Sequence, residues 1–216
     1  MRVMHVMGGG DVGGAKTQIM NTVTGLSRTN DVMLISFRAG PFADEARERG
    51  IDVRVIERHN PFRAARTMRD LVDEFKPDII HCHGWMTALA PLYIKKAYKD
   101  EPSFRDAKVV FSVYEDDFKN TLSDDFAAKL MLKGISKKDL GDLKEPVDYA
   151  AVCKLAVDYS DGVIQNSEKV DESIIEYARQ SGKLVLDYQN PENYADACNE
   201  FYDQVWDATA NKEEEE

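Results

Sequence analysis

The chain has 216 residues, a formal net charge of −11 at pH 7, and 43% hydrophobic and 31% charged residues. These values fit one globular domain and argue against a nucleic-acid partner, because phosphates are bound through clustered Lys and Arg. No stretch approaches the roughly 20 apolar residues of a membrane span. Three scattered cysteines fit reduced thiols, and the apolar run after Arg2 is too short for a signal peptide. We therefore expect a cytoplasmic protein.

The first predicted strand runs into a glycine-rich turn. Val3–Met7 is apolar, residues 8–14 contain five glycines, and a helical pattern starts near Ala15. Glycine lets the backbone approach a ligand closely, and the free amides at a helix start favour an anion. The turn therefore predicts an anion site, with Gly10, Gly13, Gly14 and Lys16 as its candidate residues.

This turn allows two other interpretations. Residues 8–13 match G-x-G-x-x-G literally, the pattern of nicotinamide dinucleotide sites. Such a site expects an acidic residue at the end of the second strand, but Asp31 stands at its beginning and Ser36 to Arg38 at its end. A turn with only a structural role is the remaining alternative.

Strand and helix patterns alternate along the rest of the chain. The predicted strands after the first are 32–35, 51–56, 79–83, 109–113, 162–165 and a short edge strand over 183–187. The predicted helices are 15–26, 42–49, 60–75, 86–98, 124–133, 147–159, 167–181 (capped by Ser167 and closed by Gly182) and 191–206. Alternation of this kind predicts a doubly wound, Rossmann-like α/β domain with a mostly parallel sheet and helices on both faces. We place it at residues 1–210, with a rim insertion over 115–146 and an acidic tail over 211–216.

The ligand site of such a sheet lies beyond the carboxyl ends of its strands. In the strand 79–83, His81 and His83 share one face and Cys82 takes the other. His83, nearer the strand end, is the candidate to contact a sugar hydroxyl or a carbonyl, whereas His81 also fits a buried, hydrogen-bonded role. Two histidines could ligate a metal, but no further ligand stands at a recognisable spacing, so we predict no metal site.

Polar and aromatic residues also follow the strand 109–113. Glu115, Asp116 and Asp117 fit either acid–base or magnesium chemistry, or a solvated loop. Aromatic side chains near the strand ends could stack on sugars or simply pack. These aromatic residues are Trp85, Tyr114, Phe118 and Tyr149. We take His81, Trp85, Tyr114 and Glu115 as candidates for a sugar pocket.

Two family resemblances together cover nearly the whole chain. From the start to His83, the strand, the glycine loop ending Gly13-Gly14-Ala15 and the segment Lys-Pro-Asp-Ile-Ile-His-Cys-His resemble the N-terminal half of family-four glycosyltransferases of the GT-B fold. From His81 onward, the segments at 81–91 and 156–168 and the last helix resemble bacterial glycogen (starch) synthases of family five, particularly Bacteroides-type relatives.

These resemblances imply hexosyl transfer from a nucleotide-sugar to a glucan or other glycan, without a cofactor. They place Gly13 and Gly14 beside the donor diphosphate and acceptor, and His83 in the sugar pocket as the candidate catalytic residue. Lys16 follows the glycine pair, whereas the synthase loop lysine precedes it, so that lysine's role does not transfer. Synthases also have aspartate at the position of Gly84 and His-Asn where Tyr114-Glu115 stand.

GT-B transfer takes place between two domains, and the resemblance covers only the first. We therefore expect that this chain does not catalyse the transfer on its own. A partner domain or a second copy of the chain, in a homo-oligomer, could complete the site. The alternatives are a non-catalytic binding module and, as a minor one, an NAD(P)-binding oxidoreductase. Up to His83, ten of twelve basic residues are arginine, whereas fourteen of the sixteen later ones are lysine. This change suggests a chain recombined near residues 78–85.

Overall fold

The computed structural model describes residues 1–9, 14–57, 61–131, 134–141 and 143–213. Its centre is a seven-stranded sheet in the order β3-β2-β1-β4-β5-β6-β7, in which every neighbouring pair is parallel. The strands are β1 (Arg2–Met7), β2 (Asp31–Ser36), β3 (Asp52–Val55), β4 (Ile79–His83), β5 (Lys108–Val113), β6 (Gly162–Gln165) and β7 (Leu184–Leu186). The predicted doubly wound α/β class is confirmed.

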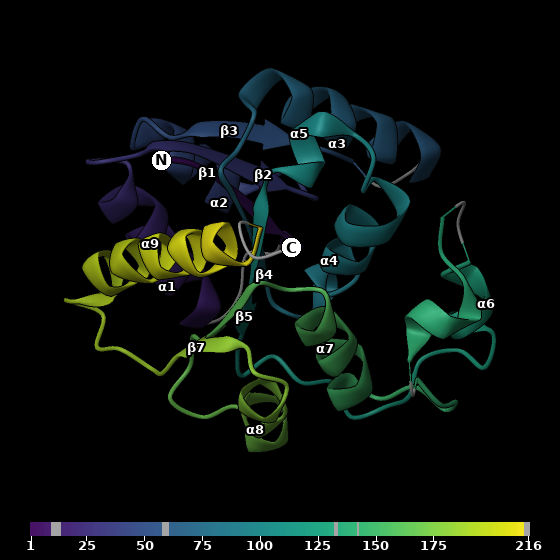
Figure 1. Cartoon of the computed structure of the whole chain (residues 1–216). Helices are drawn as coiled ribbons and strands as arrows, with labels where there is room; N and C mark the ends of the chain where they lie inside the picture. Colours follow the sequence, from purple (N-terminus) through teal and green to yellow (C-terminus); the bar gives the residue numbers. More distant parts are fainter. Residues whose placement is uncertain (10–13, 58–60, 132–133, 142, 214–216) are drawn as a thin grey trace.

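The central strands are buried on both faces because helices cover each side of the sheet. Every residue of β4 and β5 is buried, as expected for a parallel sheet between two helical layers. The helices α1 (Gly14–Leu26), α2 (Pro41–Glu48) and α9 (Tyr194–Glu213) pack on one face. The other face is covered by α3 (Pro61–Phe75), α4 (Ala90–Leu92), α5 (Pro102–Arg105), α7 (Tyr149–Asp158) and α8 (Glu172–Gln180). Figure 1 shows α9 lying beside α1, although the two helices are far apart in sequence.

The segment after β4 differs from the continuous helix predicted over 86–98. It consists of a 3-10 turn η1 (Trp85–Thr87), the single turn α4 and a π-helical turn η2 (Tyr93–Ala97). Pro91 lacks an amide hydrogen, so it fits only the first turn of a helix, and α4 begins immediately before it. The sequence pattern therefore identified the helical character of this segment but not its interruptions.

The insertion contains less helix than predicted. The predicted helix 124–133 is reduced to α6 (Phe126–Lys129), while its last two residues lie outside the described residues. A second short turn, η3 (Lys137–Leu140), follows, and α6 lies at the periphery in Figure 1. A small apolar cluster joins this region to the domain. Its buried members are Leu92, Leu130, Ile135, Leu140 and Leu155.

Two predicted helix starts were wrong. The helix predicted from Ser167 begins at Glu172, with Asp171 as its cap: the Asp171 carboxylate accepts the Ser173 amide at 3.0 Å. Ser167 instead accepts the Glu115 amide at 3.1 Å, linking the ends of β5 and β6. The last helix starts three residues later than predicted and continues to Glu213.

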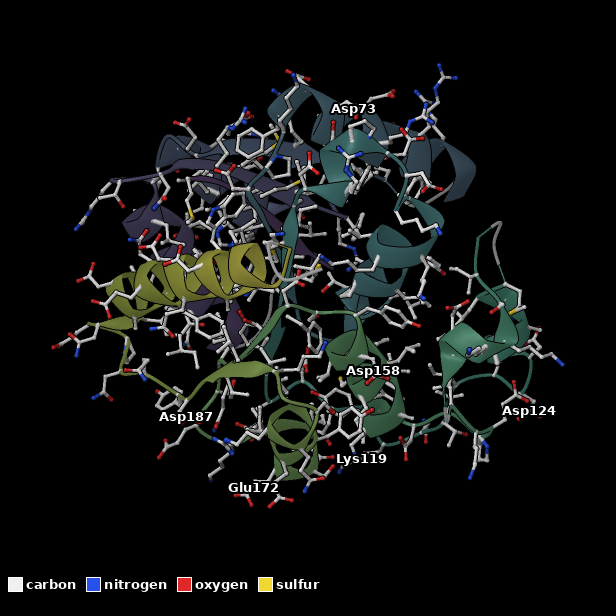
Figure 2. All side chains as sticks on the ribbon, viewed as in Figure 1. Asp73, Lys119, Asp124, Asp158, Glu172 and Asp187 are labelled. Carbon is white, nitrogen blue, oxygen red and sulfur yellow. The ribbon has the colours of Figure 1, made fainter. Side chains whose placement is uncertain are left out.

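Exposed charged residues surround the domain, as the six labelled in Figure 2 illustrate. Among the described residues, no helix combines the length and apolarity that a bilayer crossing requires.

Candidate active site

The glycine turn lies at the carboxyl end of β1, although Gly10 and Gly13 fall outside the described residues. Gly14 is the first residue of α1. Gly9 has φ +77°, and a Cβ there would lie 2.6 Å from Arg38 Cβ. A side chain at Gly9 would therefore strain the backbone and collide with the segment after β2. The described part of the turn approaches its neighbours closely, as expected of either a structural or an anion-binding turn.

Lys16 points from α1 toward α2. Its Nζ lies 3.7 Å from Glu45 Oε2 and 5.7 Å from the centre of the Phe42 ring. The ammonium is thus held by a carboxylate and an aromatic face, both from α2. A phosphate at the helix start would compete with Glu45 for this cation.

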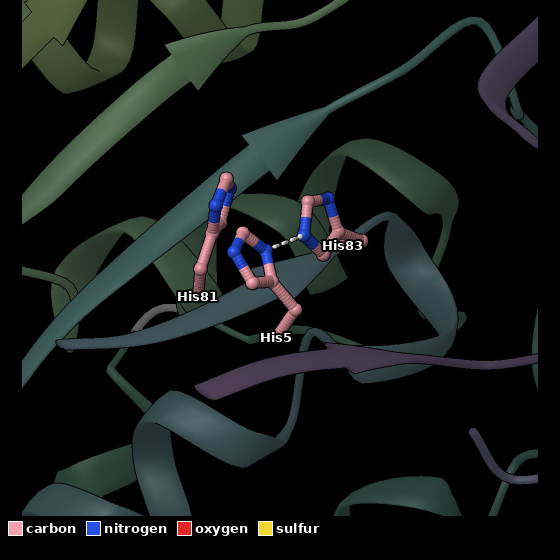
Figure 3. Close-up of side chains that lie close together, drawn as sticks. All are labelled: His5, His81 and His83. Atoms are coloured by element: carbon pink, nitrogen blue, oxygen red, sulfur yellow. Dashed lines mark hydrogen bonds between the residues drawn. The ribbon is translucent and has the colours of Figure 1, made fainter. Parts of the chain in front are cut away.

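Three histidines meet beneath α1 and α9. The parallel register of β1 and β4 places His5 beside His81, and His83 lies two residues further along the same face. The centres of the His81 and His83 rings are 3.9 Å apart, and the His5 ring lies 5.2 Å from each. Figure 3 shows the three rings together, with His5 Nδ1 and His83 Nε2 joined by a 2.9 Å hydrogen bond. His81 is fully buried and His83 is 4% exposed.

Hydroxyl groups surround these rings. Tyr114 Oη lies 2.7 Å from His83 Nδ1, and Tyr202 Oη on α9 lies 2.7 Å from His81 Nδ1. Ser112 Oγ lies 2.6 Å from His81 Nε2. Asn166, after β6, donates from Nδ2 to Tyr114 Oη. The four central strand ends and α9 therefore share one buried polar network.

Burial keeps the imidazoles neutral. It lowers the pKa of His5 to about 3, and together with the neighbouring rings it holds the pKa of His81 and of His83 well below the ordinary value. Burial also raises the pKa of the Tyr114 phenol. Because His83 is neutral and both ring nitrogens have partners, its present arrangement is that of a positioned, uncharged hydrogen-bonding group.

An open pocket of about 440 Å³ lies at the ends of β5 and β6. Its residues include two of the predicted sugar-pocket candidates, Tyr114 and Glu115. Most of the remaining polar side chains are acidic: Asp117, Asp148 and Asp171, with Lys169 as the cation. The pocket thus brings these side chains together at the carboxyl edge, and it adds acids from the starts of α7 and α8.

A carboxylate also lies beside Gly84. Asp116 Oδ2 is 3.3 Å from the Trp85 amide nitrogen, and a Cβ at Gly84 would lie 2.4 Å from that oxygen. Tyr149 Oη lies 2.9 Å from Asp116 Oδ1. Asp116 therefore occupies the space into which a side chain at residue 84 would extend. Burial raises the pKa of the Asp116 carboxyl.

The predicted aromatic candidates pack against one another at this edge. The Trp85 and Phe118 rings are 4.9 Å apart in an edge-on arrangement, and Phe118 and Tyr149 are 5.7 Å apart. Trp85 is half-buried, whereas Glu115 is exposed. These rings form a wall between η1 and the pocket.

Sequence reasoning missed His5, Asn166 and Tyr202. His5 points to the same face of β1 as Val3 and Met7. Its place beside His81 could have been predicted by assuming that β1 pairs with the fourth strand. Tyr202 lies 121 residues from His81 in sequence. No local pattern signals that contact, because it depends on how α9 packs across the sheet.

A parallel sheet with helices on both faces and a polar pocket at its carboxyl edge defines a Rossmann-like domain of the kind found in GT-B glycosyltransferases. The family model described as starch synthase catalytic domain matches residues 61–185. This match covers more than half of the chain, so the chain belongs to the starch synthase catalytic domain family.

Curated relatives are glycogen synthases matched over short stretches. The chain is 49% identical to that of Desulfitobacterium hafniense over 41 residues, 19% of this chain and 9% of the relative. It is 28% identical to that of Desulforamulus reducens over 102 residues, 47% of this chain and 21% of the relative. The matched part of the chain thus spans about a tenth to a fifth of these relatives' length.

Solved structures share the fold at low sequence identity. The catalytic domain of starch synthase IV from Arabidopsis thaliana, bound to ADP and acarbose, superposes with a TM-score of 0.60 at 15% identity. That similarity covers 88% of this chain and 51% of the other. The Anabaena protein HepE in complex with UDP-glucose gives a TM-score of 0.50 at 17% identity, covering 87% and 43%.

Proposed function

We propose that this chain forms one half of a glycogen or starch synthase-like site that transfers a hexose from a nucleotide-sugar to a glucan or related glycan. The observation that carries the proposal is the family match over residues 61–185, which includes β4, β5 and β6 and the pocket residues at their ends. The starch synthase IV structure binds ADP and acarbose, a nucleotide and a saccharide.

In this proposal, Gly14 and the turn before it contact the donor phosphates or the acceptor, and His83 positions a sugar group. Trp85, Tyr114 and Glu115 border the sugar, and Asp116 supplies the carboxylate at the corner where the resemblance predicts an aspartate at residue 84. His83 is neutral and hydrogen-bonded on both nitrogens, so it contributes by orientation rather than as a cationic acid.

We further propose that turnover needs a second nucleotide-binding domain besides these residues. About half of the starch synthase IV chain has no counterpart in the superposition. Domain closure around a donor also supplies much of the positioning and water exclusion on which such transfer depends.

The test has two measurements on the purified chain. With ADP-glucose or UDP-glucose and a maltooligosaccharide, no nucleoside diphosphate should be released above background. In amide NMR spectra, the same ligands should shift resonances at Gly14, His83 and Glu115 while leaving Asp31 and Asp78, at the opposite edge of the sheet, unchanged. Release that Glu115→Gln abolishes would refute the requirement for a second domain. Absence of any shift at the carboxyl edge would instead favour the non-catalytic alternative.

A further inference from the structure

We propose that His5, His81 and His83 form a binding site for a divalent transition metal ion of the zinc class. The sequence offered only two histidines at a recognisable spacing. The pairing of β1 with β4 supplies the third, and one nitrogen from each ring lies within 4.8 Å of the other two. This inference concerns metal binding and does not depend on the proposed transferase function. An ion on His83 Nε2, with Tyr114 on Nδ1, would replace the direct contact with a sugar proposed for His83.

The hydrogen-bond chain leaves one ring nitrogen without a partner. If Tyr114 donates to His83 Nδ1, then His83 Nε2 donates to His5 Nδ1, and His5 Nε2 carries an unpaired N–H. If the chain runs in reverse, His5 Nε2 is an unpaired acceptor. In both arrangements this fully buried nitrogen has no partner among the described residues. Such a group costs roughly 1–3 kcal/mol. It is not the atom that faces His83, since His5 Nδ1 takes that place, so the case for a metal rests on the grouping of the three rings.

The chemistry of the three side chains selects the ion. Neutral imidazole is the ligand form that zinc, copper and nickel prefer, whereas Mg²⁺ and Ca²⁺ prefer oxygen. Burial favours the neutral form of all three rings. Three histidines with a fourth, open position are an established zinc arrangement.

The surrounding hydroxyls suit the outer layer of such a site at two of its rings, His81 and His83, whereas the second nitrogen of His5 has no such partner among the described residues. A ligating imidazole normally hydrogen-bonds through its second nitrogen, which fixes the ring. Tyr114 already holds His83 Nδ1, leaving Nε2 for the ion. His81 has hydroxyls on both nitrogens, so one contact opens on binding while the other remains.

The distance between His5 and His83 requires only a small adjustment. His5 Nδ1 and His83 Nε2 are 2.9 Å apart. Two nitrogens bound tetrahedrally at about 2.0–2.1 Å from zinc lie roughly 3.3 Å apart. Exchanging the hydrogen bond for the metal thus separates the rings by a few tenths of an ångström.

The test uses untagged protein, Zn²⁺ in competition with a chromophoric chelator, and Co²⁺ as a visible-absorbing substitute. We expect one ion per chain, tetrahedral-type Co²⁺ absorption and a higher thermal midpoint with Zn²⁺ but not with Mg²⁺. His5→Gln and His83→Gln should each lower Zn²⁺ affinity by more than about tenfold. His59→Gln, which changes the one histidine outside the cluster, should leave affinity unchanged.

A second measurement needs no variant and so does not depend on how the substitutions fold. In ¹H–¹⁵N spectra of the histidine rings, Zn²⁺ should shift three of the four rings of the wild-type chain. Zn²⁺ binding that survives in folded His5→Gln, or shifts confined to His59, would overturn the proposal. Absence of binding by the wild-type chain would do the same.

Discussion

At the residue scale, the buried polar network concentrates its hydrogen bonds on a few hydroxyls. Tyr202 provides the only described partner of His81 Nδ1. A buried polar atom that loses its partner retains its desolvation cost, whereas a partner lost at the surface is replaced by water. The hydroxyl of Tyr202 therefore contributes to stability through the histidine that it contacts.

We expect Tyr202→Phe to lower the free energy of unfolding by about 1–3 kcal/mol. The substitution keeps the ring in place but leaves His81 Nδ1 unpaired. Urea denaturation at pH 7.5 measures the change. Tyr188→Phe, which removes a hydroxyl from a partly exposed ring, serves as the control, and equal effects of the two would contradict the role assigned to Tyr202.

Asp116→Asn should stabilise the protein at neutral pH. The pKa of the Asp116 carboxyl is raised, so the native state binds the proton more tightly than the unfolded state and stability falls as pH rises from the ordinary value of 3.8 through the raised one. Asparagine stays neutral, and its oxygen can still accept from Tyr149. Its Nδ2 cannot accept from the Trp85 amide, but that loss is the same at every pH, so the pH-dependent part of the change reports the charge. The gain in urea midpoint should be full at pH 7.5 and vanish toward pH 3.8, where the wild-type side chain is protonated.

A gain that is independent of pH would show that the charge of Asp116 is not its cause. Asp117→Asn, at the neighbouring exposed carboxylate, should change the midpoint much less at every pH.

At the element scale, the start of α8 depends on one short side chain. Asp171→Ala removes the acceptor of the Ser173 amide, and loss of such a cap costs about 0.5–2 kcal/mol. We expect faster hydrogen exchange at the Ser173 amide.

Ser167→Ala is the matched comparison for this cap. It should accelerate exchange at the Glu115 amide and leave Ser173 protected, because Ser167 Oγ accepts from Glu115. Loss of Ser173 protection in Ser167→Ala would instead indicate that Ser167 caps the helix, as the sequence predicted.

Most elements could be predicted because their apolar patterns are local. The strand 162–165 was predicted with its observed bounds, and the short edge strand near 184–186 was also found. The failures involve competition between neighbours. Ser167 and Asp171 are both good caps, and only the loop contact with Glu115 decides between them. Pro91 divides the segment 86–98, where periodicity alone predicts one helix.

The site was predictable to the extent that it follows strand alternation. Alternation placed His81 and His83 on one face, and the strand ends located Tyr114 and Glu115. The contacts of His81 with His5 and with Tyr202 depend on strand order and on the packing of α9. Both are tertiary properties, so the three-histidine cluster could not be derived from spacing along the chain.

At the scale of the whole molecule, an open apolar groove of about 900 Å³ separates α3 from the segment that follows β4. Its residues come from both sides of the proposed junction at 78–85. The earlier segment contributes Val6, Phe37, Ala64, Ala65, Met68 and Val72, the junction itself Ile80, and the later segment Ala90, Tyr93, Ile94, Tyr98, Phe104 and Lys129. The family match begins at residue 61, upstream of that junction. That the chain was recombined from two origins is a proposal, and sequencing the gene at its source locus would test it.

Ala64→Leu should stabilise the protein by about 0.5–2 kcal/mol, because the larger side chain fills part of this groove at little cost in helix propensity. Ala128→Leu, at an exposed position of α6, is the control for adding the same atoms at the surface. A decrease in the urea midpoint of Ala64→Leu would show that the groove is already optimally packed.

The position of α9 governs when the domain can be completed during synthesis. The β1–α1 unit is synthesised well before Phe201, Tyr202 and Val205, which cover its face of the sheet. Until they emerge, His81 lacks its tyrosine partner and α1 lacks the helix beside it. A nascent chain stalled before residue 194 should therefore expose this face to chaperones and proteases, and synthesis through Val205 should protect it.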